Sequence, residues 1–297
     1  MTTATYSEQK APAIHLRERT LWGDAVRRFA RNKLSVAALV LALLLIGLAI
    51  FAPVFAPEGY DDQNYTVAWQ PPSAEFPLGT DQFGRSLWSR IVYGARISLS
   101  VALVVNAVAF LVGAPIGALA GWYGGVIDYF LMRLVDVMSA FPTLLFALLM
   151  LTTIGSGLFN LYLALSITSW IGIARLLRGQ FLSLREQEFV VAAHASGVPT
   201  WQILWRHMTP NALAPVIVSL TLGIPSAIMG EAGLSFLGIG VDPPTPSWGK
   251  MVSEYLPYVQ THWYLSTFPA MMIALTMYAF TLMGDGLQDA LNPRAGR

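Results

Sequence analysis

The stretch that decides the fold is LSVAALVLALLLIGLAIFAPVFA, residues 34–56. It carries no charged side chain and is longer than the about 20 residues that an α-helix needs to cross the hydrocarbon core of a membrane. It is also too long for the apolar region of a secretory signal peptide, and it lacks a small-residue cleavage site. Basic residues precede it in 1–33. The run therefore predicts a first membrane-spanning helix.

The composition extends this prediction to the whole chain. Of the 297 residues, 55% are hydrophobic and 12% are charged, and the mean hydropathy is +0.55. A soluble domain has about 25% charged residues. Further apolar segments lie at 97–120, 130–152, 158–175, 211–230 and 264–284. We therefore predict an all-α integral membrane protein with six transmembrane helices.

The basic residues predict the orientation, because loops that stay in the cytoplasm are enriched in Lys and Arg. If the N-terminus is cytoplasmic, only four of the 18 Lys and Arg residues lie outside, namely Arg85, Arg90, Arg96 and Lys250. Both termini are thus predicted to be cytoplasmic. The predicted regions are a cytoplasmic tail (1–33), the first span (34–56), an extracytoplasmic loop (57–96), a transmembrane core (97–284) that includes a cytoplasmic loop (176–210) and an extracytoplasmic loop (231–263), and a second cytoplasmic tail (285–297).

Glycines four residues apart mark one face of the second span. Gly113, Gly117, Gly121 and Gly125 would lie on one side of a helix, where small residues let helix backbones approach closely. We interpret this face as tight packing within the chain, and a subunit interface is the alternative. In the third span, Arg133 and Asp136 are one turn apart and predict an ion pair at the membrane edge, rather than a role in transport.

The sequence offers no catalytic or metal site of a known pattern. It has no cysteine, its four histidines lack metal-ligand spacing, and no GxxxxGK[ST] loop for phosphates occurs. The acidic pairs Glu231 with Asp242 and Asp285 with Asp289 fall on opposite sides of the membrane, so we expect capping and solvated roles for them. The chain is predicted not to be an enzyme, and no substrate-contacting residue can be named.

The cytoplasmic loop contains VVAAHASGVPTWQILWRHMTPN, residues 190–211. Phe189 to Ala195 is predicted to be a short helix that Gly197 ends and Pro199 keeps from continuing. A second short helix is predicted from Trp201 to His207. Such a helix can dock in a groove of another protein or lie on the lipid headgroups.

The loop resembles the "EAA" loop of ABC-importer permeases. Ala192, Ala193 and Gly197 match that signature, and Pro210 matches its closing proline, whereas Val191 replaces a Glu and Thr209 replaces a Leu. In the family this loop is the coupling helix that sits in a cleft of the ATP-hydrolysing subunit. The resemblance implies an ATPase-docking element at Glu188, Val191, Ala192, Ala193, His194, Gly197, Val198, Pro199 and Arg206.

Four longer motifs are similar to those of the dipeptide/oligopeptide/nickel permeases, in particular their C-type subunit. They are PLGTDQFGRSLWSRIVYGARISL (77–99), AFPTLLFALLM (140–150), EAGLSFLGIGVDPPTPSWGKM (231–251) and GDGLQDALNPR (284–294). The resemblance implies the fold of a type I ABC importer permease in a bacterial inner membrane. It implies three kinds of partner: a second, homologous permease, two ATPase subunits that bind ATP and Mg, and an extracytoplasmic binding protein facing 76–86 and 231–254. No cofactor is implied in this chain.

The substrate stays open at this point. Peptides are the family's commonest cargo, and nickel complexes or oligosaccharides are alternatives. An ion-gradient-driven transporter would favour ionisable residues at mid-membrane and an inverted repeat. A membrane-embedded enzyme would need a polar cluster at one depth, and a purely structural subunit would not need a coupling-type loop.

Overall fold

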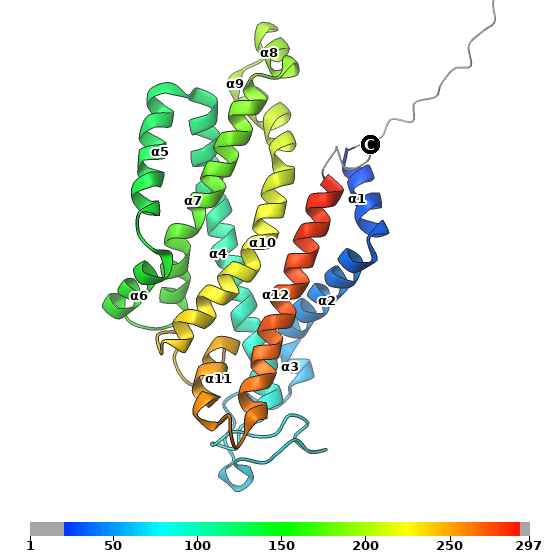
Figure 1. Cartoon of the computed structure of the whole chain (residues 1–297), viewed down its shortest axis with the longest axis vertical. Helices are drawn as coiled ribbons and strands as arrows, with labels where there is room; N and C mark the ends of the chain where they lie inside the picture. The colour runs from blue at the N-terminus through cyan, green and yellow to red at the C-terminus, as the bar shows by residue number, and fades with distance from the viewer. Residues whose placement is uncertain (1–20, 292–297) are drawn as a thin grey trace, which may run out of the picture.

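The computed structural model describes residues 21–291, and within that range the backbone is helical apart from turns, loops and one isolated bridge between Thr80 and Ser86 (Figure 1). The predicted tails at 1–20 and 292–297 lie outside the described residues. The helices in chain order are α1 (Leu21–Arg31), α2 (Lys33–Ile50), α3 (Ala52–Phe55), η1 (Tyr65–Val67), α4 (Leu87–Tyr123), α5 (Gly125–Ser139), α6 (Thr143–Ile154), α7 (Leu158–Arg185), α8 (Glu188–Ala195), α9 (Thr200–Gln202), η2 (Ile203–Met208), α10 (Thr209–Phe236), α11 (Trp248–Tyr255), η3 (Leu256–Tyr258) and α12 (Trp263–Leu291).

Five helical stretches of residues 21–291 are long and apolar enough to span a membrane, and a bent pair makes a sixth candidate. The segment predicted as a span at 130–152 consists of two helices, because α5 and α6 meet at an angle of 75°. Pro142 precedes the first residue of α6 and has a non-helical backbone, and a proline disfavours the helical conformation of the residue before it. The other predicted spans form helices, but α4 begins at Leu87 and α7 continues to Arg185.

The glycine face of α4 packs against α7, which confirms the interpretation of tight packing within the chain for three of its four members. A Cβ built at Gly121 would lie 2.6 Å from the Cβ of Phe181, and one at Gly113 would lie 2.5 Å from the carbonyl oxygen of Trp170. Gly117 is equally close to α7. Gly125 lies beyond the end of α4 and has open space around it.

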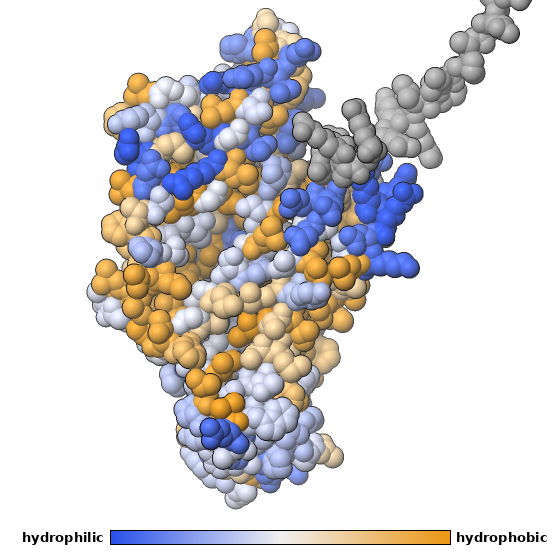
Figure 2. All heavy atoms as spheres, in the orientation of Figure 1, coloured by the Kyte–Doolittle hydropathy of each residue, from blue (hydrophilic) through white to orange (hydrophobic). Residues whose placement is uncertain are grey.

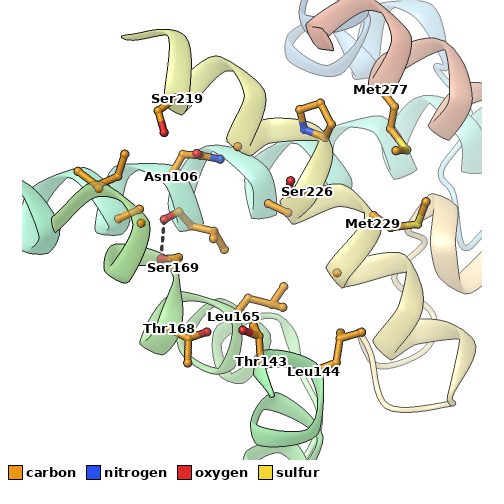
Figure 3. A pocket seen from close by; sticks show the side chains of 18 residues that line it. Asn106, Thr143, Leu144, Leu165, Thr168, Ser169, Ser219, Ser226, Met229 and Met277 are labelled. Carbon is orange, nitrogen blue, oxygen red and sulfur yellow. Dashed lines mark hydrogen bonds between the residues drawn. The ribbon is translucent and has the colours of Figure 1, made fainter. Parts of the chain in front are cut away.

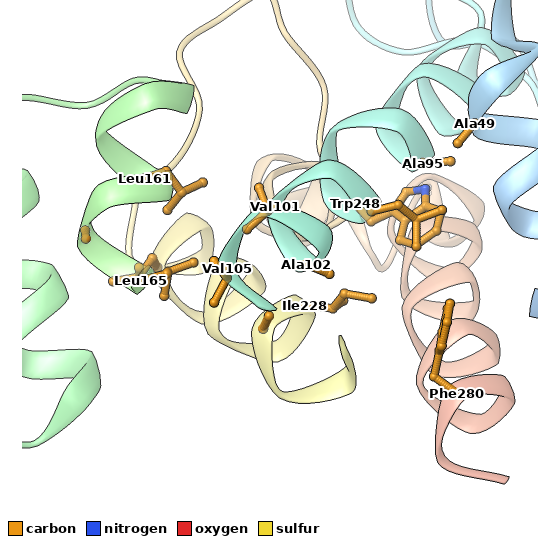
Figure 4. Packing of buried hydrophobic residues seen from close by; sticks show 14 of the residues in the cluster. Ala49, Ala95, Val101, Ala102, Val105, Leu161, Leu165, Ile228, Trp248 and Phe280 are labelled. Carbon is orange, nitrogen blue, oxygen red and sulfur yellow. The ribbon is translucent and has the colours of Figure 1, made fainter. Parts of the chain in front are cut away.

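Side chains from α2, α4, α6, α7, α10, α11 and α12 form one continuous apolar core (Figure 4). The predicted ion pair also forms, with Arg133 Nη1 4.0 Å from Asp136 Oδ2. A nearer partner comes from α7, because Arg175 donates to Asp136 over 3.1 Å. The pair therefore also links α5 to α7 at the edge of the bundle.

The helical bundle has two ends, which we name the α8 end and the α11 end after the helices that lie there (Figure 1). Hydrophilic residues gather at both ends, and hydrophobic ones cover much of the face between them (Figure 2). Residues 21–31, predicted to be part of a polar tail, instead form α1, which packs beside α12 at the α8 end. At this end the bundle therefore includes α1, a helix that was not predicted from the sequence.

Candidate functional site

The loop between α7 and α10, residues 186–208, is a compact helical segment that we name the hook. Glu188 occupies the first turn of α8, where the helix dipole favours a carboxylate. At the other end Gly197 has φ +77°; its N–H donates to the carbonyl of His194 over 3.0 Å, and Val198 N–H donates to that of Ala193 over 3.2 Å. This pair of bonds is a Schellman motif, which ends a helix at a left-handed residue. The predicted helix end is confirmed at the predicted glycine.

Apolar side chains anchor the hook to the bundle. Val190 is buried and Ala193 and Val198 are half-buried, in a cluster that includes Ile203 and Phe181. Packed interiors have little room to compress, so a force on α8 is passed to the helices beneath it. The inner face of α8 is thus held against the bundle.

The predicted second short helix is not a separate element. From Thr200 the backbone continues through the π-helical turn η2 into α10 without a break, as far as Phe236. Pro210 in the first turn of α10 has no N–H to donate. At the preceding residue, the Thr209 N–H and the Thr209 hydroxyl both donate to the carbonyl of Leu204, five residues back, the hydroxyl over 2.9 Å. The part of the hook after Pro199 and the span α10 are therefore one continuous helical rod, Thr200–Phe236, and α8 is a separate helix beside its start.

Most of the residues predicted to dock another protein lie on the free surface of the hook. The exposed ones are Glu188, Val191, Ala192, His194, Gly197, Pro199 and Arg206, whereas Ala193 and Val198 face the chain's own core. Large apolar side chains are also exposed here, with Val191 at 55% and Trp205 at 72% of their maximal area. Contiguous exposed apolar groups mark a surface that binds a protein or a membrane.

A cavity of about 620 Å³ lies between α4, α6, α7, α10 and α12 (Figure 3). None of its 18 lining residues is charged. Its polar side chains are Asn106, Thr143, Thr168, Ser169, Ser219 and Ser226. Two of them bind backbone carbonyls of α4: Asn106 Nδ2 donates to Ala102 over 2.8 Å and Ser169 Oγ to Val105 over 3.2 Å.

No local pattern in the sequence predicts this cavity, because its polar residues are spread over four apolar segments. Only the packing of α4, α6, α7 and α10 brings them together. The Thr168 hydroxyl is buried and has no partner among residues 21–291. A buried polar group without a partner is costly, so this wall has unused capacity for hydrogen bonds.

Glu231 is the second feature that sequence reasoning missed. We expected a capping or solvated role, but the side chain has no exposed area at all. Its carboxylate accepts hydrogen bonds from Ser235 (2.8 Å), Ser247 (2.6 Å) and Ser98 (3.3 Å). These serines lie on α10, before α11 and on α4, so one carboxylate ties three elements together. By contrast, Asp242, Asp285 and Asp289 are exposed, as solvated roles require.

At the α11 end, the 77–86 motif folds against α11 through a buried ionic cluster. Asp81 accepts from Arg85 Nε over 2.6 Å and from the Tyr255 hydroxyl over 2.9 Å. Glu254 accepts from Arg85 and from Arg90, each over 3.0 Å. Burial raises the pKa of the Tyr255 hydroxyl well above its usual range, so the phenol stays neutral and its O–H donates a hydrogen bond to Asp81.

This cluster buries part of the loop 76–86, whereas Pro77 stays exposed. Residues 79–81 and 84–86 are buried within the chain, so they do not face an external protein. The exposed surface at this end comes largely from residues 57–77 and 256–263. Any partner at the α11 end meets those residues first.

Comparison with known proteins places this architecture. Residues 113–297 match the family described as "binding-protein-dependent transport system inner membrane component", and residues 20–72 match the "N-terminal TM domain of oligopeptide transport permease C". A chain of the methionine ABC transporter, solved in inward-facing conformations, superimposes with a TM-score of 0.56 at 18% identity, over 68% of this chain and 96% of that one. At that identity the likeness concerns the fold.

Curated relatives are similar over nearly their whole length. The dipeptide transport system permease protein of Bacillus subtilis (strain 168) is 42% identical, over 92% of this chain and 86% of the relative. The oligopeptide transport system permease protein of Escherichia coli (strain K12) is 38% identical over 97% and 96%. The glutathione transport system permease protein of Pectobacterium atrosepticum is 39% identical over 93% and 92%.

Proposed function

Because this chain belongs to the family of binding-protein-dependent transport system inner membrane components, we propose that it forms one half of the pathway of an ATP-driven peptide importer. It is a permease subunit of an ABC transporter and not itself an enzyme. Peptides are proposed as the cargo because similar permeases are named for dipeptide and oligopeptide transport. Nickel complexes and oligosaccharides remain the alternatives.

The proposed partners are a second, homologous permease, two ATPase subunits that bind ATP and Mg, and an external binding protein. The chain has no GxxxxGK[ST] loop, so the nucleotide belongs to the partners. We assign the α8 end to the cytoplasm, because most Lys and Arg residues within 21–291 lie on the helices of that end. The α11 end then meets the binding protein.

The observation that carries the proposal is the continuous helix from the hook to the cavity. The rod from Thr200 to Phe236 begins beside α8 and passes Ser219 and Ser226, which line the cavity. We propose that an ATPase which displaces α8 moves the start of this rod through the packing of Val190 and Val198 on Ile203, and with it one wall of the cavity. The surface proposed to dock the ATPase consists of Glu188, Val191, Ala192, Ala193, His194, Gly197, Val198, Pro199 and Arg206, with Ala193 and Val198 acting as its anchors.

The cavity wall fits a cargo with many backbone amides and variable side chains. Its hydroxyls and its one amide, Asn106, can each accept or donate a hydrogen bond. An uncharged wall holds such a cargo loosely, which permits release. We propose that Asn106, Thr168, Ser169, Ser219 and Ser226 contact the peptide in transit.

The test is to purify the complex through a tag on this chain and to reconstitute it in liposomes with its binding protein. We expect a second permease and two ATPase subunits to co-purify, and labelled dipeptide or oligopeptide to enter only with ATP. An ATP-dependent uptake of nickel or oligosaccharide, but not of peptide, would replace the cargo. Uptake driven by an ion gradient without ATP would overturn the proposal.

A further inference from the structure

A polar pocket of about 250 Å³ lies at the α11 end of the bundle, and we name it the outer pocket. It is formed by the loop before α7, the end of α10, the loop that follows α10, and α11. Its lining residues are Ser156, Ser235, Gly238, Gly240, Val241, Asp242, Pro243, Lys250, Ser253 and Glu254. Three of them carry a charge, whereas the cavity between α4 and α10 has no charged residue in its wall. The outer pocket therefore suits an ionic ligand.

The outer pocket lies on the same helix as the cavity proposed for the peptide. Gly230 lines that cavity and Ser235 lines the outer pocket, and five residues of α-helix span about 7.5 Å. Because α10 runs from the α8 end to the α11 end (Figure 1), the outer pocket is the farther of the two from the hook. With the α8 end in the cytoplasm, it lies on the side from which cargo arrives.

Lys250 is the only basic residue in the wall of the outer pocket, and it has no ionic partner there. Its ammonium donates a hydrogen bond to the backbone carbonyl of Val241, which uses one of its three N–H donors. Within residues 21–291, no carboxylate lies within ion-pair distance of Lys250. Desolvation at this half-buried position lowers the pKa of Lys250 below its usual value. A bound anion would offset that cost, because it stabilises the charged form.

The two carboxylates of the outer pocket are engaged by other groups. Glu254 accepts hydrogen bonds from Arg85 and from Arg90, each over 3.0 Å. Asp242 accepts one from a serine hydroxyl of the loop before α7. Lys250 thus keeps two donors that have no acceptor in the described part of the chain. Such a recessed ammonium recognises a carboxylate through charge-assisted hydrogen bonds.

We propose that the outer pocket binds the C-terminal carboxylate of a peptide before the peptide enters the cavity, with Lys250 as the partner of that carboxylate. The inference rests on the proposed function, because it takes the cargo to be a linear peptide. Every unmodified linear peptide ends in this group whatever its side chains are, so one lysine serves a varied cargo. The recess favours a small ligand over a carboxylate side chain of the binding protein, because Lys250 is half-buried in a pocket and not fully exposed.

The test is the protection of a thiol placed in the outer pocket. Ser253 lines the pocket and the natural chain has no cysteine, so Ser253→Cys gives this chain a unique site for a maleimide. The purified complex, without ATP or binding protein, is labelled over a concentration series of N-acetyl-Ala-Ala and of its C-terminal amide. The mass of this chain reports the labelling rate. We expect the acid to halve that rate at a concentration about tenfold lower than the amide, because a hydrogen bond to a charged group contributes on that order.

Substitutions in the Ser253→Cys background identify the group that is responsible. Lys250→Gln should remove the difference between acid and amide, and Lys250→Arg should keep it. Asp242→Asn should lower the half-protecting concentration of the acid, because it removes a like charge from the pocket. That variant leaves Lys250 in place, so it decides the question even if Lys250→Gln alters the labelling rate without peptide. In a chain that keeps Ser253, Tyr65→Cys at the same end is the control thiol, which neither peptide should protect.

Equal protection by the acid and the amide with Lys250 intact, or an unchanged difference in Lys250→Gln, would overturn the proposal. A thiol that only the peptide-free binding protein protects would overturn it too, since Lys250 would then serve a carboxylate of that protein. Because the readout is a labelling rate, it is separate from uptake. Peptide uptake without protection would refute this inference alone, whereas protection without peptide uptake would refute the proposed function alone.

Discussion

Replacing Gly197 tests how the hook transmits movement. This glycine holds φ +77° at the end of α8, and an added Cβ would meet no heavy atom within 4 Å. A substitution here therefore changes backbone strain and not packing. A left-handed conformation costs an L-residue about 1–2 kcal/mol, whereas Asn tolerates it better.

That strain is large on the scale of a local equilibrium. A cost of 1–2 kcal/mol changes the ratio of the hooked to the frayed loop by a factor of roughly 5–30. A frayed loop loses the bonds of Gly197 to His194 and of Val198 to Ala193. The end of α8 is then no longer held, and part of the displacement that the ATPase imposes on α8 is not transmitted to α10.

The assay is the number of peptides imported per ATP hydrolysed, measured on the reconstituted complex. We expect Gly197→Ala to lower this ratio, Gly197→Val to lower it further, and Gly197→Asn to stay nearest the natural value. Gly179→Ala is the matched control, because Gly179 lies inside α7 and also has open space around it. A methyl group inside a helix stabilises by about 0.5–1 kcal/mol, so the control carries the opposite sign.

The reasoning is refuted if Gly197→Ala and Gly197→Val both import as many peptides per ATP as the natural chain. If Gly197→Ala or Gly197→Val fails to assemble in the membrane, Gly197→Asn alone carries the test. We then expect that variant to retain both the complex and the natural number of peptides imported per ATP.

Three further predictions concern the frame around the pathway. Gly121→Ala places a Cβ 2.6 Å from α7, so we expect overpacking of about 1–3 kcal/mol and a lower unfolding temperature of the complex. Glu231→Leu leaves three serine hydroxyls without their acceptor, at about 1–3 kcal/mol for each unpaired group, whereas Glu231→Gln should unfold at a higher temperature than the Leu variant. Asp81→Asn removes a charge that Arg85 and Arg90 face in the buried cluster, which should cost about 3–5 kcal/mol and expose the 77–86 motif to limited proteolysis.

The sequence predicts well what depends on neighbouring residues. The apolar spans follow from a sum over a local window, and the end of α8 follows from one glycine. The four-residue spacing of Gly113, Gly117 and Gly121 predicts a close helix contact. The same spacing does not predict that α7 is the partner helix, because that depends on how the other spans are arranged around α4.

The features that sequence reasoning missed depend on distant residues. Glu231 accepts hydrogen bonds from Ser98 and Ser247 of other elements, and its one partner within α10, Ser235, does not by itself predict burial. The polar wall of the cavity between α4 and α10 likewise consists of residues from separate helices, such as Asn106 and Ser169. The bend before α6 is local, but Pro142 stands inside a largely apolar run, where a proline is compatible with a continuous span.

The most direct test of the account is a contact between α8 and an ATPase subunit. The natural chain has no cysteine, so Val191→Cys introduces a unique thiol on the exposed face of α8, and Tyr65→Cys introduces one at the α11 end, where Tyr65 is 67% exposed. With a thiol-to-amine cross-linker on the transport-competent complex, we predict that Val191→Cys joins this chain to the ATPase and that Tyr65→Cys does not. An absence of ATPase adducts at position 191, or their presence at position 65, would contradict the account.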